Sequence, residues 1–260
     1  MMKQRLDNEL VRRGLVATRS QAESYTKLGK VTVDGHSITK PGYFISMNAD
    51  INLSTDVQYV SRAGLKLESV ASNLKLNFRG KVVLDVGSST GGFTDYALRH
   101  GAKKVYAVDV GTDQLHSNLH GDKRIELHEK TDIRNFFPNE TPDIVLIDVS
   151  FISLREILPH IAKIINPISN SLYSEPTPSP QVVAMVKPQF EAGKDQTNKG
   201  IIKNDSIRRQ ILRDFEDWSK KYFVIIDKRD SDVAGAKGNQ ERFYLLTLNR
   251  NSTTSPGRIT

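Results

Sequence analysis

The strongest constraint on the fold of this chain is an alternation of short apolar runs with helical stretches from residue 80 onward. The apolar runs are Val82–Val86, Val105–Val110, Ile144–Val149, Val182–Val186, Phe223–Ile226 and Phe243–Leu248. Helical spacing between them is clearest at 91–99, 153–165 and 206–221. Nearly continuous apolar strands separated by helices are typical of a mostly parallel sheet covered on both faces. With a short further strand before Thr131, the pattern predicts an α/β fold with a Rossmann-like, seven-stranded sheet.

The first part of the chain has a different pattern. Residues 4–13 have helical spacing and end at a glycine, and a second helix is expected from Thr18 or Ser20 to 29. Asp34-Gly35, between two short β-type runs, predicts a two-residue hairpin turn. Residues 43–53 are expected to add one more strand. This stretch is therefore predicted to form a small α+β domain.

These patterns divide the chain into four parts. We expect the small domain at 1–58, a connector with its first helix at 59–80, the α/β domain at 81–249 and a disordered tail at 250–260. The Ser- and Pro-rich stretch 166–181 is expected to be a surface loop.

The charge is concentrated at the front of the chain. The 260 residues carry a net charge of +7, and residues 1–46 hold eight Lys or Arg against four Asp or Glu. A basic segment favours a polyanionic partner because its side chains replace phosphate counterions. An ordinary solvated helix face is the alternative interpretation. The candidate contacts to RNA or DNA are Arg5, Arg12, Arg13, Arg19, Lys27 and Lys30, together with Arg62 in the connector.

Composition excludes several classes of protein. The chain has no cysteine, which rules out disulfide scaffolds, thiolate metal sites and cysteine nucleophiles. No apolar run approaches the roughly 20 residues of a membrane-spanning helix, and the charged first residues do not resemble a signal peptide. We therefore expect a soluble, cytoplasmic protein with no membrane association and no obligatory protein partner.

A glycine-rich turn follows the first strand of the α/β domain, in the stretch DVGSSTGGF at 85–93. The dinucleotide fingerprint G-x-G-x-x-G would need glycine where Ser89 stands, and no Walker lysine follows. The remaining pattern, an acid and two spaced glycines, is typical of the first motif of methyltransferases that use S-adenosylmethionine. Asp85 is then placed for the cationic methionine portion of that cofactor.

Two further acids follow strand ends in the order that such a cofactor needs. Asp109 is placed to accept hydrogen bonds from ribose hydroxyls, and Asp132 with Ile133 to meet the adenine ring. The alternative is that each acid only caps the next helix. The predicted cofactor-binding residues are Asp85, Gly87, Ser88, Ser89, Gly91, Gly92, Phe93, Asp109, Asp132, Ile133 and Asp148.

A candidate catalytic set combines two lysines with two carboxylates. Asp148 and Lys187 end neighbouring strands, and the carboxyl ends of parallel strands share one rim. Lys66 lies upstream, and Glu241 opens the last strand. Methyl transfer to a ribose hydroxyl requires loss of a proton, and a lysine can accept it only if its pKa falls from about 10.4 toward neutrality. A second ammonium group and burial both lower a lysine pKa.

These residues match the Lys-Asp-Lys-Glu tetrad of FtsJ-like ribose 2′-O-methyltransferases. The stretches VSRAGLKL, DVGSSTGGFTD, LIDVSFISL, VKPQFEAGK and GNQERF resemble the TlyA family, and the front helices and hairpin are similar to the alpha-L RNA-binding domain. The resemblance covers residues 3–249. It implies a methyltransferase that uses S-adenosylmethionine to modify cytidine 2′-hydroxyls in ribosomal RNA, with ribosomal RNA or ribosomal subunits as partners.

Three other functions are weighed against this one. Members of the TlyA family are often labelled hemolysins, but the helix expected at 206–221 carries an ordinary core stripe rather than a lytic face. A non-catalytic, RNA-binding assembly factor would be expected to lose tetrad or cofactor-site residues, and this chain keeps them. Ser89 argues against a nicotinamide-dependent enzyme.

Overall fold

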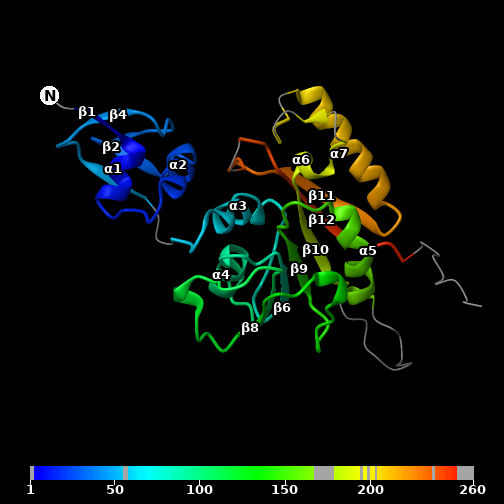
Figure 1. Ribbon diagram of the computed structural model, residues 1–260. Coiled ribbons are helices and arrows are strands. Elements are labelled where there is room, and N and C mark those ends of the chain that lie inside the picture. The colour runs from blue at the N-terminus through cyan, green and yellow to red at the C-terminus, as the bar shows by residue number, and fades with distance from the viewer. Residues whose placement is uncertain are drawn as a thin grey trace, which may run out of the picture.

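The computed structural model describes residues 3–54, 58–166, 179–193, 196–197, 200–202, 204–235 and 238–250. Most of the expected surface loop at 166–181 and the tail from 251 lie outside the described residues. The described part consists of a small N-terminal unit followed by a larger α/β unit (Figure 1).

The N-terminal unit contains two helices and five short strands. In chain order these are β1 (Lys3–Arg5), α1 (Leu6–Arg12), α2 (Arg19–Lys27), β2 (Val31–Val33), β3 (His36–Ser37), β4 (Phe44–Ser46) and β5 (Ile51–Leu53). Thr18 caps α2 in a capping box with Gln21. The predicted hairpin is confirmed, with Asp34 and Gly35 both at positive φ between β2 and β3.

Two predictions for this unit were wrong in detail. The helix expected at 4–13 begins only at Leu6, because residues 3–5 pair with β4 as a strand. Residues 43–53 form two strands rather than one. A turn closed by the Ala49 amide and the Ser46 carbonyl separates them, so β4 pairs with β1 and β5 pairs with β2.

The larger unit is built on a seven-stranded sheet in the order β11-β12-β10-β9-β6-β7-β8. β12 runs opposite to the other six strands, which confirms the expected mostly parallel sheet. The strands are β6 (Val82–Val86), β7 (Lys104–Val108), β8 (Ile125–His128), β9 (Ile144–Ile147), β10 (Gln181–Val186), β11 (Phe223–Asp230) and β12 (Arg242–Leu248).

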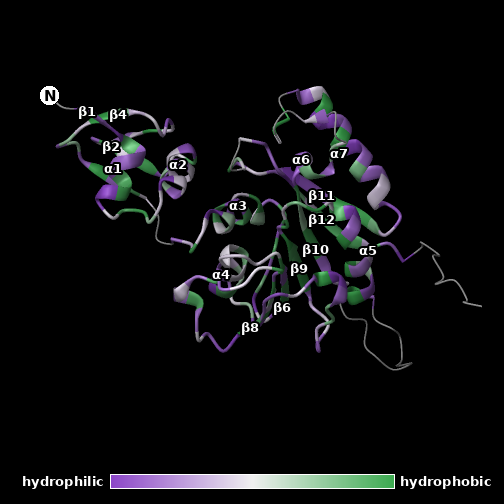
Figure 2. Cartoon of the chain, in the orientation of Figure 1, coloured by the Kyte–Doolittle hydropathy of each residue, from purple (hydrophilic) through white to green (hydrophobic). Residues whose placement is uncertain are grey.

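Helices cover both faces of this sheet (Figures 1 and 2). On one face α3 (Arg62–Ala71) and α4 (Gly92–Arg99) pack on one apolar cluster, and on the other face α5 (Leu154–Ile165) and α7 (Asp205–Ser219) pack on a second. Shorter helices are η1 (Ser117–Leu119), η2 (Ile133–Asn135) and α6 (Pro188–Glu191). Alternate strand residues supply the two clusters because side chains point to opposite faces of a sheet.

The two units share an apolar core. One cluster runs from Leu10 and Tyr25 of the N-terminal helices through Tyr59 of the connector to Leu65 of α3. The side-chain amide of Gln21 also donates a hydrogen bond to the Tyr59 carbonyl at 3.2 Å. Within the described residues, no helix is long and apolar enough to cross a membrane.

Candidate active site

The glycine turn after β6 depends on close backbone approaches. Gly87 has a φ of +80°, and a Cβ there would lie 2.7 Å from the carbonyl oxygen of Asp148. Gly91 has a φ of +86°, and its Cβ would overlap the side chain of Leu119. Only glycine accommodates both requirements without strain. The turn therefore lies close against the end of β9 and leaves an open cavity above it.

Asp85 at the end of β6 has the least exposed carboxylate of the site. It is fully buried, and one of its oxygens accepts a hydrogen bond from Thr94 Oγ1 at 2.6 Å. The other oxygen, like Ser88 Oγ, has no hydrogen-bond partner within the described residues. Burial raises the pKa of Asp85 to about 7. A buried, unpartnered carboxylate oxygen at this position fits a cationic group, as the sequence predicts for the methionine portion of S-adenosylmethionine.

Two adjoining cavities lie at this edge of the sheet. The larger, of about 470 Å³, is lined by the glycine turn, by Asp109 and by Asp132 and Ile133. The smaller, of about 150 Å³, is lined by Asp85 and by the side chains of Asp148 and Lys187. The cofactor residues expected from the sequence are therefore divided between these two cavities. The exceptions are Gly91, the N-cap of α4, and Gly92, its first residue, which line neither.

Asp109 and Asp132 differ in how their oxygens are used. Asp109 accepts hydrogen bonds from the Ser89 amide at 2.8 Å and the Gly111 amide at 2.7 Å. Asp132 caps η2 and forms an ion pair with Arg134 at 2.6 Å, which lowers the pKa of Asp132. Asp132 thus makes the contacts expected of a residue that only caps a helix, although it also lines the larger cavity.

The four tetrad residues form two ion pairs. Lys187 Nζ lies 2.6 Å from Asp148 Oδ1, and Lys66 Nζ lies 2.6 Å from Glu241 Oε2. Their side chains are no more than 14% exposed. The expected shared rim of Asp148 and Lys187 is thus present, and Lys66 approaches from α3. Buried pairs of this kind hold both partners in defined positions, because separating them leaves a charge uncompensated.

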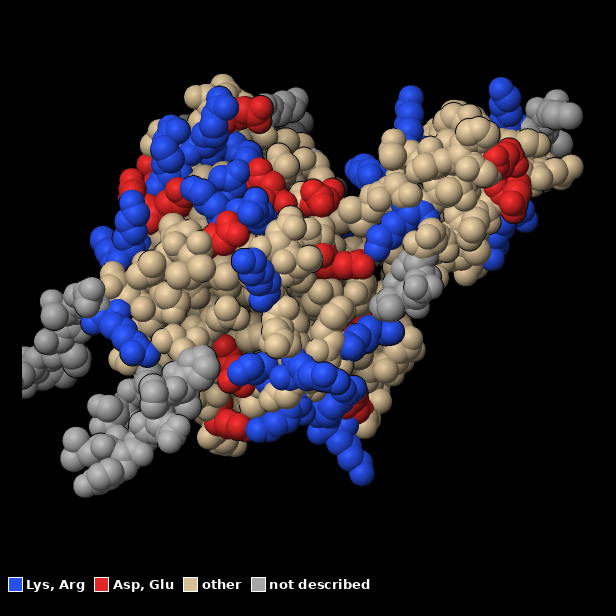
Figure 3. All heavy atoms as spheres, turned by 180° about the vertical axis from the view of Figure 1, so that it is seen from behind, with Lys and Arg blue, Asp and Glu red and all other residues tan. Residues whose placement is uncertain are grey.

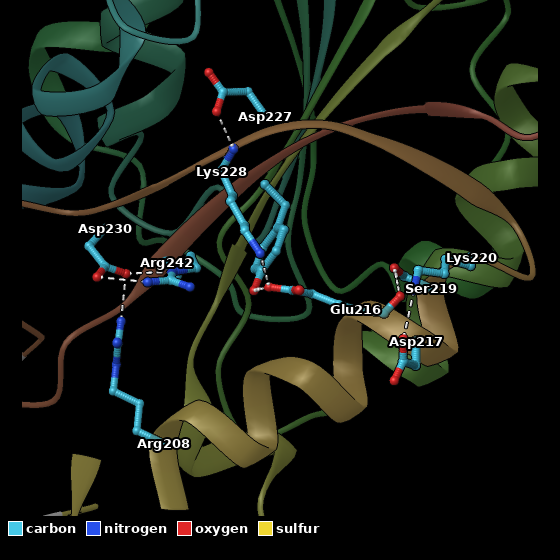
Figure 4. A network of polar contacts seen from close by, with 10 residues as sticks. Arg208, Glu216, Asp217, Ser219, Lys220, Asp227, Lys228, Asp230 and Arg242 are labelled. Carbon is cyan, nitrogen blue, oxygen red and sulfur yellow. Dashed lines mark hydrogen bonds and ion pairs between the residues drawn. The ribbon is translucent and has the colours of Figure 1, made fainter. Parts of the chain in front are cut away.

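Charged contacts anchor β12, the strand that follows Glu241 (Figure 4). Asp230 of β11 accepts hydrogen bonds from Arg242 and from Arg208 of α7, both at 2.6 Å. Burial acts to raise the pKa of Asp230, but the two guanidinium groups outweigh it and lower the pKa overall. The network joins α7, β11 and β12 directly beside Glu241.

Sequence reasoning missed two residues beside Lys187. Ser150 Oγ accepts a hydrogen bond from Lys187 Nζ at 2.8 Å. Phe151 is 92% exposed at a φ of +67°, and its ring centroid lies 5.3 Å from that of Phe190. An apolar residue in the loop directly after Asp148 was the available signal for Phe151. Phe151 also lines the larger cavity, so its exposed ring is accessible to a molecule bound there.

Glu191, the last residue of α6, connects the segment after β10 to the loop after β9. Its buried carboxylate accepts hydrogen bonds from Ser153 Oγ and from the Leu154 amide, both at 2.6 Å, at the start of α5. Burial raises the pKa of Glu191. The loop after β9 is therefore anchored to the loop after β10.

Several candidate RNA contacts of the N-terminal unit are already ion-paired. Arg5 and Arg19 lie 2.7 and 2.9 Å from Asp7, whose side chain is fully buried. The hydrogen bond from Arg5 is the main cause that lowers the pKa of Asp7 to about 2. Part of the positive charge of these arginines is therefore neutralised by a buried carboxylate within the N-terminal unit.

The second buried acid, Glu9, pairs with Arg12 and Arg13, both at 2.6 Å. Arg13 also donates hydrogen bonds to two backbone carbonyls, and Lys30 pairs with Glu68 at 3.0 Å. Among the candidates in the described chain, Lys27 and Arg62 carry no ion pair. Figure 3 shows further Lys and Arg side chains over the side that carries α7 and β11, interspersed with acids.

A mostly parallel seven-stranded sheet with a glycine turn, a buried carboxylate and two lysine–carboxylate pairs at its carboxyl edge defines a Rossmann-like methyltransferase. In this molecule a small helix-and-hairpin unit precedes it.

The chain belongs to the FtsJ-like methyltransferase family, whose model matches residues 59–249, and residues 4–51 match the S4 domain. It is 37% identical over 243 residues to hemolysin A of Brachyspira hyodysenteriae, covering 91% of this chain and 97% of that one. It is 34% identical over 249 residues to the 16S/23S rRNA (cytidine-2′-O)-methyltransferase TlyA of Mycobacterium tuberculosis, covering 93% and 89%.

A solved protein from Streptococcus thermophilus that carries a hemolysin name is similar in structure, with 38% identity and a TM-score of 0.67. The match covers 97% of this chain and 93% of that one. The family expected from the sequence motifs is thus confirmed.

Proposed function

We propose that this protein transfers a methyl group from S-adenosylmethionine to the 2′-hydroxyl of a cytidine in ribosomal RNA. The observation that carries the proposal is the Lys187–Asp148 ion pair, which lines the same small cavity as the unpartnered carboxylate oxygen of Asp85. We infer from this that a proton-accepting group and a cation-binding group share one space. The name of the Mycobacterium tuberculosis relative supports the choice of substrate.

Residues at the glycine turn would hold the cofactor. Asp85 would face its cationic end, while Asp109 and Ile133 would lie along the larger cavity for ribose and adenine. When bound, S-adenosylmethionine supplies a methyl group on a positively charged sulfur. Residues of the protein would carry out the other steps, which are orienting the hydroxyl group and accepting its proton.

Lys187 Nζ is the atom that we propose receives the 2′-hydroxyl proton. An amine accepts a proton only after its ammonium form has released one, so we propose that Lys187 first gives a proton to solvent. Asp148 and Ser150 orient the resulting amine, which they contact at 2.6 and 2.8 Å. The Lys66–Glu241 pair would supply the second ammonium group of the tetrad. Much of the acceleration would come from holding the hydroxyl in line, because fixing two reactants removes a large entropic cost.

The S4 domain would bind RNA through phosphate contacts that set position rather than sequence. We assign residues 1–58 to this role, 59–80 to the connector and 81–249 to methyl transfer. Ribosomal RNA or ribosomal subunits would be the partners, which places the reaction in the cytoplasm. The deep, narrow groove of an RNA helix offers little access to base edges, so such a domain reads shape and backbone.

Transfer of tritiated methyl from S-adenosylmethionine to isolated ribosomal subunits tests the proposal. Wild-type protein should place label on ribose, where it blocks alkaline cleavage, and Lys187→Ala should lower the rate at least 100-fold because the proton acceptor is lost. Lys163→Ala, at an exposed position of α5, is the matched control. Cofactor binding by each variant shows that the fold is retained.

Tight cofactor binding without transfer to either subunit or to naked RNA would contradict the proposal. It would favour a non-catalytic assembly factor instead. Label on a base rather than on ribose would keep the methyltransferase and overturn the choice of acceptor.

A further inference from the structure

A cavity of about 460 Å³ lies where the S4 domain meets the methyltransferase domain. Its polar lining comes from both sides, with Thr18 and Gln21 at the start of α2, Ser61, Arg62 and Lys66 at the start of α3, and His116 before η1. No Asp or Glu of the described chain lines it. It shares Ser61 with the small cavity that holds Asp148 and Lys187, so the two spaces adjoin.

The charge of this cavity is positive. Lys66 is balanced by Glu241 at 2.6 Å. Arg62, which also lines the cavity, has no ion pair and no guanidinium hydrogen bond within the described residues. An unpaired guanidinium in a cavity without carboxylates attracts an anion, and its planar array of donors matches phosphate oxygens.

His116 adds a donor to the same space. Its Nδ1 accepts a hydrogen bond from the Asn118 amide at 3.2 Å. In a neutral imidazole one nitrogen accepts and the other carries the proton, so Nε2 is left as a donor. Ser61 Oγ is buried and has no hydrogen-bond partner in the described chain, which leaves its hydroxyl free as well.

We propose that this cavity binds a backbone phosphate of the RNA strand that carries the target ribose, with Arg62 and His116 as its ligands. The inference rests on the proposed function and specifies how the substrate is held. A ribose is covalently joined to its phosphates, so a ribose at Lys187 places a phosphate in a neighbouring space. Within the described residues, the adjoining cavity offers unpaired positive charge and free donors.

The first test measures RNA affinity as a function of salt. Arg62→Gln should weaken binding of the ribosomal substrate about tenfold and reduce the slope of log affinity against log salt by about one, because one phosphate contact is lost. Arg79→Gln, an exposed arginine without an ion pair at the opposite edge of the sheet, should change neither. His116→Gln keeps a donor and should lose less affinity than His116→Ala.

The second test removes the charge from the RNA instead. A substrate fragment with one methylphosphonate next to the mapped target ribose should bind wild-type protein about tenfold more weakly. The same fragment should cause almost no further loss with Arg62→Gln, because the contact is already absent. Independent, additive losses at every position around the target would overturn the phosphate site.

The outcomes separate this inference from the proposed function. If wild-type protein methylates RNA and both Arg62→Gln and His116→Ala keep wild-type affinity and salt slope, the phosphate site is wrong and the function stands. If wild-type protein binds S-adenosylmethionine but modifies no ribosomal RNA, the function fails and the phosphate site fails with it. Unchanged cofactor affinity in the variants shows that the loss is specific to RNA.

Discussion

Asp85 shows how one residue acquires its chemistry from its surroundings. In water its carboxyl group would be ionised at neutral pH, but complete burial at the end of β6 raises its pKa to about 7. At neutral pH the folded protein therefore holds this carboxyl group partly protonated. The resulting contribution to stability is fully present below the ordinary carboxyl pKa of about 3.9 and is lost as the pH rises through about 7.

Cofactor affinity should consequently depend on pH through Asp85. A cation favours the ionised carboxylate, so we expect S-adenosylmethionine to bind more tightly as the pH rises from 5.5 to about 7 and to level off above. Asp85→Asn should weaken binding and flatten this profile, whereas Asp232→Asn, at an exposed loop, should retain it. Calorimetric titration across this pH range measures both. A flat wild-type profile would show that Asp85 does not face the cation.

The arrangement of elements depends on a close approach of α3 and α4. A Cβ on Gly92 would overlap Ser61 Oγ and lie 2.7 Å from Ala63 Cβ, and it would reach the Gly64 amide at 3.0 Å. The missing side chain therefore lets the start of α3 lie against the start of α4. This contact places Lys66, one turn further along α3, beside Glu241.

Gly92→Ala should therefore separate the two helices. We expect a loss of about 1–3 kcal/mol in the free energy of unfolding, because overpacking displaces well-ordered backbone. Methyl transfer should fall more than cofactor binding, since Lys66 moves with α3. Urea unfolding and transfer rates measure the two effects. Gly193→Ala, where a Cβ would meet nothing closer than 3.7 Å, is the control, and equal stability of both variants would count against this packing.

At the scale of the whole molecule, the two units are joined by a continuous apolar cluster rather than by a flexible tether. The cluster crosses the connector at Tyr59, and Gln21 and the Lys30–Glu68 pair add polar links. Continuity of this kind makes the stability of one unit depend on the other. It also keeps the S4 domain at a defined distance from the site.

The protein should accordingly unfold in one transition. Trp218, the only tryptophan, packs on Phe215 and Tyr222 in the α/β unit and reports that unit alone by fluorescence. Its thermal transition should coincide with that of far-ultraviolet circular dichroism, which reports both units. Gln21→Ala should lower both midpoints together. Two separated transitions would show that the units unfold independently.

The sequence alone determined the architecture of the larger unit and the order of its site. Apolar strand runs, the glycine turn at Gly87 and the placement of Asp148 and Lys187 at strand ends are local features, so they can be predicted from spacing. Short strands were less predictable. β1 and β4 exist because they pair with each other, and each alone is only three residues long.

Only the tertiary structure decided which basic side chains pair with which carboxylates. Sequence spacing could not show that Lys66 pairs with Glu241 or that Asp7 and Glu9 pair with four of the candidate arginines. Nor could it show that Arg62, which lines a cavity with His116, has no ion pair within the described residues. These contacts join residues from different elements or depend on which side chains become buried. Burial sets the cost of an uncompensated charge, and burial exists only once the chain has folded.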